Sequence, residues 1–497
     1  MNLLLLIPIL LPLAGGICSI SLKPLAKEKA RTAFVLTMLI ASACSLLPVL
    51  LNPELSLKLF TLSDSLPVVL KNDPVGKFFA VLIAVVWTLA GAYSFEYMAH
   101  EGHLNRFYCF YLCTMGVLFA LCFSATIITY YMFYEMMSLM SVPLVMHTMK
   151  KDAVAAGVKF LIYSVVGASL VLLGIFLISP YVSGFAFSSE GVLNYTVING
   201  HETRVLIACL LMLVGFGTKA GMFPLHGWLP TAHPAAPSPA SAVLSGIITK
   251  TGVLGVIRVV FFFIGAGFIR GTWVQYTFIC LTLFTVLMGS LLAFREKVLK
   301  KRLAYSSVSQ VSYVLFGIAT LTPFGLIGAF LHIIAHSLIK DTLFMSAGAI
   351  IEKTGKTKVF ELRGIGKQMP IVMWCFTLTS VGLIGIPPCL GFVSKWYLAQ
   401  GALDMNSIST VFNYLGPAIL LISALLTAGY LLPISIKGFF PGTSNSENES
   451  SGENEFPNCE PTYVMLVPMI ILTALSILIG MFPGQIIGFI SNFMIGR

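Results

Sequence analysis

Charged side chains are scarce in this sequence: Asp, Glu, Lys and Arg together make up 10% of its 497 residues. Soluble domains carry about 25% charged residues, so the scarcity excludes a sizeable soluble domain. Hydrophobic residues make up 57% of the chain. They recur in runs of about 20 residues, each long enough as a helix to cross the hydrocarbon core of a bilayer. The sequence therefore predicts an all-α polytopic integral membrane protein embedded in a lipid bilayer.

Motifs for cofactors, metals and nucleic acids are also lacking. The ten cysteines include no CxxC pair, which argues against iron–sulfur or haem ligation. His332 and His336 stand in HIIAH, which lacks the glutamate of the zinc motif HExxH. The net charge of +10 comes from basic residues scattered between apolar runs, which excludes a nucleic-acid surface. With no quinone, flavin or nucleotide motif either, we predict no metal, cofactor or redox site in this chain.

Hydropathy and helix-breaking residues divide the chain into about fourteen transmembrane helices. The first is predicted to be a retained helix and not a signal peptide, because basic residues follow its apolar run and none precedes it. The predicted ranges are 2–22, 31–51, 74–98, 106–124, 126–147, 153–179, 204–230, 238–263, 271–294, 302–320, 323–351, 369–400, 412–437 and 462–490.

Basic residues are distributed unevenly between alternate loops. One set of loops holds eighteen of them, among them Lys300, and the other set holds five. The positive-inside rule makes the first set cytoplasmic and places both termini outside. The cytoplasmic set includes the segment 441–461, which is acidic, rich in Ser and Asn, and predicted to be disordered.

Seven basic residues fall inside or close to predicted helices, where ionisable side chains are rare and usually functional. Three of them, Lys77, Lys159 and Arg258, lie near helix ends, so anchoring by snorkelling to the interface stays open beside a functional role. Three others are far from either end of their helices, and we predict that they transfer protons. The seven are Lys77, Lys159, Lys219, Lys250, Arg258, Lys340 and Lys395.

Two further groups are titratable. Glu135 lies in the middle of the fifth predicted helix and needs a basic partner to stay ionised there. His332, His336 and Lys340 follow one another at intervals of four residues, so they are expected on one face of the eleventh helix. Because histidine titrates near neutral pH, that face could relay protons, or it could be a satisfied packing stripe. Asp341 is expected to pair with Lys340.

Three stretches carry a family resemblance: FYEMMSLMSVPLV at 133–145, GFGTKAGMFPLHGWLPTAHPAAPSPASAVLSGIITKTG at 215–252, and GIPPCLGFVSKWYLAQ at 385–400. They resemble the antiporter-like subunits shared by respiratory complex I, Mrp-type sodium/proton antiporters and membrane-bound hydrogenases. The resemblance spans about residues 70–435. It implies fourteen core helices with two inverted five-helix repeats, helices 4–8 and 9–13, and a break in helices 7 and 12. The breaking residues would be Pro224 in the first, and Pro387 and Pro388 in the second.

The resemblance also implies proton transfer at a common set of positions. A glutamate of helix 5 and a lysine of helix 7 form a pair, helix 8 carries a bridging lysine, and histidines of helix 11 lead to a terminal lysine on helix 12 that faces the outer exit. The matching residues here are Glu135, Lys219, Lys250, His332, His336 and Lys395, with Lys159 and Lys340 as secondary candidates.

The expected organisation is three N-terminal helices (1–105), a first repeat (106–263), a second repeat (264–440), the acidic loop (441–461) and a C-terminal helix (462–497). The implied partners are other membrane subunits of a respiratory, hydrogenase or Mrp-type complex in a prokaryotic cell membrane. The ion is H+, alone or exchanged for Na+, and the parent complex and its driving reaction stay open. Any redox chemistry would belong to partner subunits. The alternatives are a stand-alone secondary transporter, which broken helices also suit, and an inactive scaffold subunit.

Overall fold

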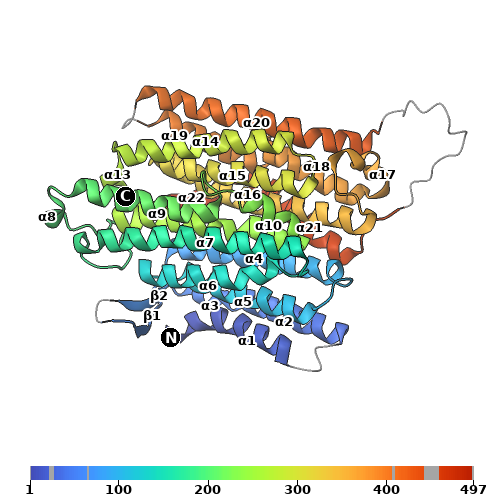
Figure 1. The fold of residues 1–497 in the computed structure, drawn as a ribbon, viewed down its shortest axis with the longest axis horizontal. Coiled ribbons are helices and arrows are strands. Elements are labelled where there is room, and N and C mark those ends of the chain that lie inside the picture. Colours follow the sequence, from blue (N-terminus) through green and yellow to red (C-terminus); the bar gives the residue numbers. More distant parts are fainter. Residues whose placement is uncertain (1, 22–26, 64–65, 406–408, 442–457, 495–497) are drawn as a thin grey trace, which may run out of the picture.

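Helices dominate the architecture, and they run side by side along the long axis of the molecule (Figure 1). The computed structural model describes residues 2–21, 27–63, 66–405, 409–441 and 458–494. Most of the acidic loop predicted at 441–461 therefore lies outside the described residues. Within the described residues, four short helical segments in the connections, at 195–198, 266–269, 359–362 and 365–368, were not predicted. Neither were strands β1 (Ser56–Thr61) and β2 (Pro67–Lys71), which pair antiparallel. Their side chains alternate in burial, as expected of a hairpin lying on the helices beneath.

The N-terminal half of the chain forms a contiguous group of helices below and through the middle of Figure 1. The 3₁₀ segments there are short extensions of longer helices. The elements are η1 (Asn2–Leu6), α1 (Ile7–Ser21), α2 (Glu28–Cys44), α3 (Leu46–Leu51), α4 (Pro74–Tyr97), α5 (Leu104–Cys122), α6 (Ile127–Val145), α7 (Lys151–Ile178), η3 (Ser179–Tyr181), α8 (Tyr195–Ile198), α9 (Glu202–Ala220), α10 (Leu229–Ala235), α11 (Ser238–Val243), η4 (Leu244–Ile248), α12 (Thr249–Ile257) and η5 (Arg258–Ile264).

The C-terminal half packs beside the first, with α16 in the middle of the molecule. Its longest helix, α16, has 32 residues and contacts α15, α18, α19, α21 and α4. The elements are α13 (Ala266–Ile269), α14 (Trp273–Arg295), α15 (Leu299–Ala319), α16 (Pro323–Thr354), η6 (Val359–Leu362), α17 (Ile365–Gln368), α18 (Pro370–Ile384), α19 (Leu390–Leu403), α20 (Thr410–Phe439), α21 (Tyr463–Met481) and α22 (Gly484–Met494).

In the described part of the chain, 11 helices are long and apolar enough to cross a membrane. The predicted ranges 126–147, 302–320 and 369–400 are helical but are not among them. Helices α6 and α15, in the first two ranges, carry polar side chains along their length, and the third range holds the short helices α18 and α19, of 15 and 14 residues. The chain is thus a polytopic helical membrane protein, while the number fourteen and the inverted repeats stay predictions.

Two helices end abruptly inside the protein. α9 ends at Ala220, and Gly221 follows with φ +81°; α18 ends at Ile384, and Gly385 follows with φ +95°. Glycine adopts this left-handed conformation at little cost, which lets the chain leave the helix. The next helix begins only after Pro224 in the first case and after Pro387 and Pro388 in the second.

The interior is formed by the segment 238–264 and by α16. Every residue from Ser238 to Ile264 is buried, and so is every residue from Gly325 to Ile350. The first segment changes from α-helix to π-helix at η4 and again at η5. π-Helical turns widen a helix locally and often occur at functional sites. The polar residues that these two segments carry are therefore enclosed by protein and not by lipid.

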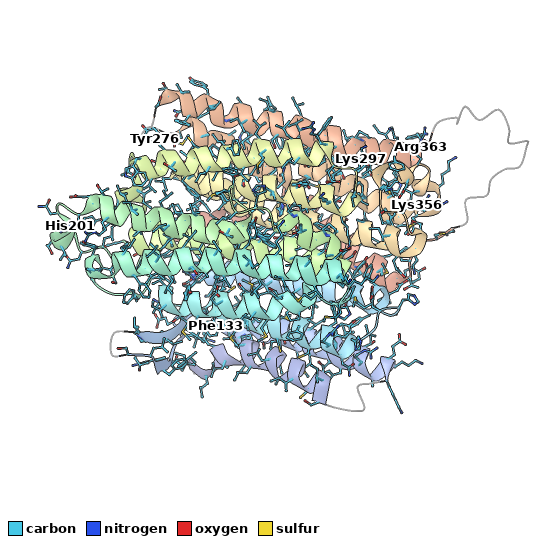
Figure 2. All side chains as sticks on the ribbon, in the orientation of Figure 1. Phe133, His201, Tyr276, Lys297, Lys356 and Arg363 are labelled. Atoms are coloured by element: carbon cyan, nitrogen blue, oxygen red, sulfur yellow. The ribbon has the colours of Figure 1, made fainter. Side chains whose placement is uncertain are left out.

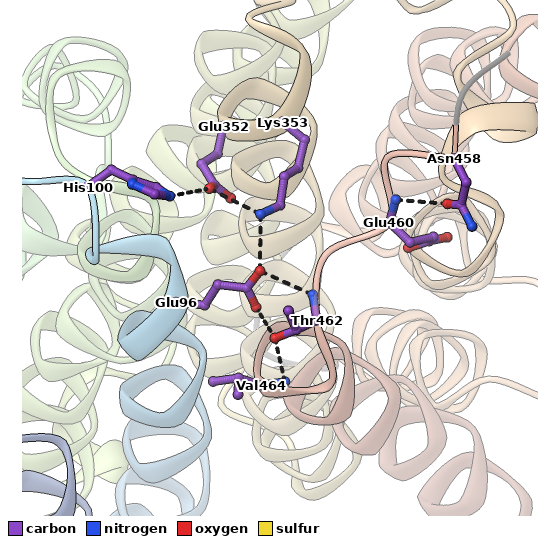
Figure 3. Close-up of polar contacts among 8 residues, drawn as sticks. All are labelled: Glu96, His100, Glu352, Lys353, Asn458, Glu460, Thr462 and Val464. Atoms are coloured by element: carbon purple, nitrogen blue, oxygen red, sulfur yellow. Dashed lines mark hydrogen bonds and ion pairs between the residues drawn. The ribbon is translucent and has the colours of Figure 1, made fainter. Parts of the chain in front are cut away.

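One end of the molecule carries basic side chains (Figure 2) and a polar cluster that joins three helices (Figure 3). Figure 2 shows Lys297, Lys356 and Arg363 at one end and His201 at the other. Near the end of α16, Lys353 donates a hydrogen bond to Glu96 of α4 at 3.0 Å, and Glu96 also accepts from the backbone N–H of Thr462 at 3.1 Å (Figure 3). This cluster ties α4, α16 and the start of α21 together.

Candidate functional site

Lys219 lies in the last turn of α9, immediately before the first helix break, and is 1% exposed. α7 and α9 approach closely through glycines: a Cβ on Gly215 would lie 2.5 Å from the Gly167 carbonyl oxygen. Small residues allow such contact between membrane helices. The close approach brings Ser164 of α7 to the lysine, and Lys219 Nζ donates to Ser164 Oγ at 2.7 Å. The ammonium also lies 4.3 Å from the Phe160 ring centroid, a cation–π contact.

Glu135 lies on α6, and its Oε1 is buried without a hydrogen-bond partner. Glu135 and Lys219 interact electrostatically, but among the described residues no direct ion pair joins them. The lysine instead uses Ser164 and the aromatic rings of Phe160 and Tyr134. In the structure, the two side chains of the predicted pair are therefore apart.

Lys250 lies on α12, directly after the π-helical turn η4, and is 1% exposed. Its Nζ donates to the Ser245 carbonyl oxygen at 2.5 Å and lies 2.5 Å from His336 Nδ1. Since a lysine ammonium has only donors, His336 accepts at Nδ1 when the lysine is charged. The hydrogen bond joins the two halves of the chain at the centre of the protein.

His332 continues this line toward the second break. The His332 and His336 rings lie 6.3 Å apart, between centroids. His332 Nδ1 lies 2.9 Å from Ser394 Oγ, and its ring stacks on Tyr313 with centroids 5.4 Å apart. Its other nitrogen, Nε2, lies 3.2 Å from Gln310 Oε1, so a serine and an amide fix the orientation of the imidazole.

Lys395 lies at the far end, on α19, beyond the second break. Its Nζ is 5.1 Å from the Tyr313 ring centroid and donates to the carbonyl oxygens of Leu383 at 2.7 Å and Ile384 at 2.8 Å. These carbonyls end α18 and have no partner within the helix. The C-terminal end of a helix carries partial negative charge, so this position favours a cation without any carboxylate.

The expected stripe on α16 is only partly correct. Lys340 Nζ donates to the Leu303 carbonyl oxygen at 2.9 Å and to Ser306 Oγ, both on α15, and so points away from the two histidines. Residues four apart drift by about 40° around a helix of 3.6 residues per turn, so Lys340 is about 80° away from His332. Asp341 does not pair with Lys340 as expected, because the Lys340 ammonium donates to α15 instead.

The other three basic residues inside or close to the predicted helices each lie in a different environment. Lys159 Nζ lies 6.0 Å from the Tyr163 ring centroid, and Lys77 Nζ donates to the Leu50 carbonyl oxygen at 3.2 Å. Arg258 is fully buried and forms a bidentate ion pair with Asp73, at 2.7 and 3.0 Å. None of these three contacts the line from Lys250 to Lys395.

Sequence reasoning missed three residues at this site. His233 on α10 is fully buried, with no partner for either ring nitrogen, and interacts electrostatically with Lys250, Lys300 and Lys340. Lys300 was assigned to a loop, but the structure buries it in the first turn of α15, where it donates to the Ala236 carbonyl oxygen at 2.9 Å. Tyr313 bridges His332 and Lys395. The signal that could have found His233 was its position between Pro230 and Pro234, in the stretch 215–252 that carries the family resemblance.

A cavity of about 320 Å³, with several charged side chains in its lining, lies near the basic end of the molecule (Figure 2) and reaches Lys300. Its lining includes Lys300, Ala236 and Pro234, together with Lys150 and Asp152 from the start of α7. Pro234 directly follows His233 in the chain. The cavity thus leads from charged residues at the helix ends to the cluster of His233 and its neighbouring lysines.

The comparison with known families agrees with this arrangement. Residues 124–420 match the model described as NADH:quinone oxidoreductase/Mrp antiporter, TM, which is more than half of the chain, and residues 60–108 match the N-terminus of chain 5 of complex I. The chain belongs to the NADH:quinone oxidoreductase/Mrp antiporter family. Every titratable group of the line described above lies within the larger match.

Curated relatives come from three kinds of complex. NADH-quinone oxidoreductase subunit N of Desulforudis audaxviator is 31% identical over 84% of this chain and 82% of its own length. An Na(+)/H(+) antiporter subunit of Bacillus subtilis is 28% identical over 83% of this chain and 80% of its own length. Hydrogenase-4 component B of Escherichia coli is 29% identical over 83% of this chain, which corresponds to 62% of the longer relative.

Solved structures share the fold. A chain of the archaeal membrane-bound sulfane sulfur reductase superposes with a TM-score of 0.81, and a chain of the Mrp complex from Dietzia sp. with 0.80. Each is 21% identical, and each match covers 98% of this chain and 96% of the other. The relatives and fold neighbours are subunits of multisubunit membrane complexes.

Proposed function

We propose that the chain translocates protons, alone or in exchange for Na+, as an antiporter-like subunit of a multisubunit membrane complex. One observation carries the proposal: titratable groups enclosed by protein follow one another from the centre of the molecule to the second helix break. It runs from Lys250 through His336 and His332, past Tyr313, to Lys395. Buried ionisable groups in membrane helices mark ion pathways, and histidine exchanges protons near neutral pH.

The proton enters from the cavity lined by Lys300 and passes His233 to Lys250. It moves along the two imidazoles of α16 and reaches Lys395, from which it leaves on the opposite side. The cavity side carries the basic loops, so by the positive-inside rule it is cytoplasmic and both termini lie outside. The resemblance and the relatives favour a prokaryotic cell membrane.

The pair of Glu135 and Lys219 changes the electric field at the titratable groups between Lys250 and Lys395 when the two side chains meet or part. When the two side chains meet, both are charged, and when they part, the lysine can release its proton. The helix break after Lys219 gives its end of α9 room to move, with Pro224 removing a backbone N–H at the break. We assign this pair to a first repeat (106–263) and the line to a second (264–440), into which Lys250 reaches from α12. Lys159 and Lys340 stay secondary candidates.

Replacing Glu135 by glutamine tests the control function. We expect proton translocation by the assembled complex in proteoliposomes to fall about 5- to 150-fold, the range of a coupling of 1–3 kcal/mol between sites. Glu54→Gln is the matched control, because Glu54 is exposed between α3 and β1. Subunit composition is checked for each variant. Unchanged translocation by Glu135→Gln in a complete complex would contradict the assignment.

A further inference from the structure

Asp341 is a fully buried carboxylate that the line of proton carriers does not include. It lies on α16, five residues after His336, and is 0% exposed. Neither carboxylate oxygen has a hydrogen-bond partner. Burying an ionised carboxylate is costly unless a charge or hydrogen bonds compensate, and nearly all buried polar groups have partners. The carboxylate of Asp341, on the central helix α16, is an exception to this rule and needs a physical explanation.

The π-helical turn η4 fixes the position of this carboxylate. A Cβ on Gly246, in the middle of η4, would lie 1.8 Å from Asp341 Oδ1, so only glycine leaves room for it. Ser337 Oγ on α16 donates to the Gly246 carbonyl oxygen at 2.6 Å and holds the two helices together. The carboxylate is therefore held against the turn that directly precedes Lys250.

Lys250 is the cation that acts on Asp341, and Asp341 is the carboxylate that acts on Lys250. Two of the three N–H groups of Lys250 are used, by the Ser245 carbonyl oxygen and by His336 Nδ1. The third has no partner among the described residues and is available to Asp341 through a bridging water. The lysine then has a proton donor or acceptor on each side.

Tyr111 of α5 also interacts electrostatically with Asp341. The other titratable groups near Lys250 are His336 and Lys340 on α16 and His233 on α10, and Lys300 of α15 interacts with His233. His336 Nε2 and both ring nitrogens of His233 are also buried without partners. Internal waters typically bind such groups with about three hydrogen bonds each, so this part of the interior favours proton exchange.

We propose that Asp341 is a proton-accepting site that exchanges one proton with Lys250. In the exchange, the N–H bond of the Lys250 ammonium breaks and an O–H bond forms on Asp341, so an ion pair becomes a neutral amine and a neutral carboxylic acid. The net charge of the pair is zero before and after. A second proton, which arrives from the His233 side, then restores the ammonium. After Lys250 has passed this proton to His336, the O–H bond of Asp341 breaks and an N–H bond forms on Lys250, which restores the ion pair. Asp341 thus reloads the first lysine of the line, and this inference rests on the proposed proton translocation.

Asp341→Asn keeps the size of the side chain but cannot accept the proton. We expect translocation by the assembled complex to fall about 10²-fold, the lower end of what a positioned proton-transfer group contributes. Asp341→Glu keeps an acid and is expected to recover part of the rate. Glu352→Gln is the matched control, because it removes a carboxylate from the end of the same helix, where Glu352 pairs with Lys353.

Infrared difference spectra between the resting and the translocating complex give a second readout. We expect a carbonyl-stretch band of a protonated carboxylic acid that shifts in D₂O, disappears in Asp341→Asn, and persists in Asp341→Glu and Glu352→Gln. A purely structural role for Asp341 would leave no such band. The proposal is overturned if the band survives in Asp341→Asn, or if that variant translocates at the unaltered rate.

If Asp341→Asn does not assemble, the spectra of Asp341→Glu decide, because its band must move with the longer side chain. If the unaltered complex moves no protons at all, the proposed function fails as a whole. If the unaltered complex translocates and Asp341→Asn does so equally well, only the role of Asp341 fails.

Discussion

Lys395→Ala is expected to lower proton translocation by the assembled complex about 10²- to 10⁴-fold, the contribution of a positioned proton-transfer group. Lys395 is the last carrier of the proposed line, and its ammonium contacts the Tyr313 ring and the carbonyl oxygens of Leu383 and Ile384. Alanine leaves those carbonyls without their cation and removes the group that releases the proton. The measurement is acidification in proteoliposomes, with subunit composition checked by gel.

A charge-preserving variant separates proton release from electrostatic anchoring. Lys395→Arg keeps a cation near the end of α18, but arginine is effectively never deprotonated in proteins. We expect it to be as inactive as the alanine variant. Lys437→Ala, at an exposed position in the last turn of α20, is the matched control and should translocate normally. An active arginine variant would show that Lys395 need not give up its proton.

Arg258→Ala is expected to lower the free energy of unfolding by about 3–5 kcal/mol, the cost of removing one partner from a buried ion pair. Arg258 is fully buried and binds both carboxylate oxygens of Asp73, which also accepts from the Gly76 backbone N–H at the start of α4. The alanine variant leaves that carboxylate with no cation. Denaturant unfolding in detergent, followed by tryptophan fluorescence, measures the loss.

Two controls test whether the unpaired charge causes this loss. Asp73→Asn combined with Arg258→Ala is expected to recover part of the stability, because asparagine is neutral and still caps a helix. Lys301→Ala breaks the more exposed ion pair with Glu296 at 3.0 Å and should cost about 1 kcal/mol or less. Equal losses from Arg258→Ala and Lys301→Ala would contradict a special role for the buried pair.

The polytopic helical fold follows from composition, because few charges and long apolar runs allow no other class. The two helix breaks were also predicted, from the family resemblance and the prolines at 224, 387 and 388. In the structure the helices end at glycines 221 and 385, which have positive φ and closely precede those prolines. The hairpin of β1 and β2 was missed because its strands are short and lie in a connection. Strand signals of this length are weak when the surrounding sequence is apolar.

Site residues that lie on the same helix were predictable from their spacing in the sequence. His332 and His336 are four residues apart on α16, and the structure places both beside other titratable groups. Tyr313 and Asp341 were not predictable as part of the site, because their roles depend on which helices pack together. Tyr313 faces His332 only through the contact of α15 with α16, and Asp341 lies against η4 because that turn has glycine at 246.

The two broken helices retain their lysines by different means. The carbonyl oxygens of α18 that bind Lys395 do not titrate, so their own charge does not change with pH. Lys219 has a carboxylate for its charged partner, and that attraction vanishes whenever Glu135 takes up a proton. The groups that bind Lys395 therefore keep a constant charge, whereas the charge beside Lys219 depends on the protonation of Glu135. In the proposed function, the first helix break thus responds to the protonation of a neighbouring carboxylate and the second does not.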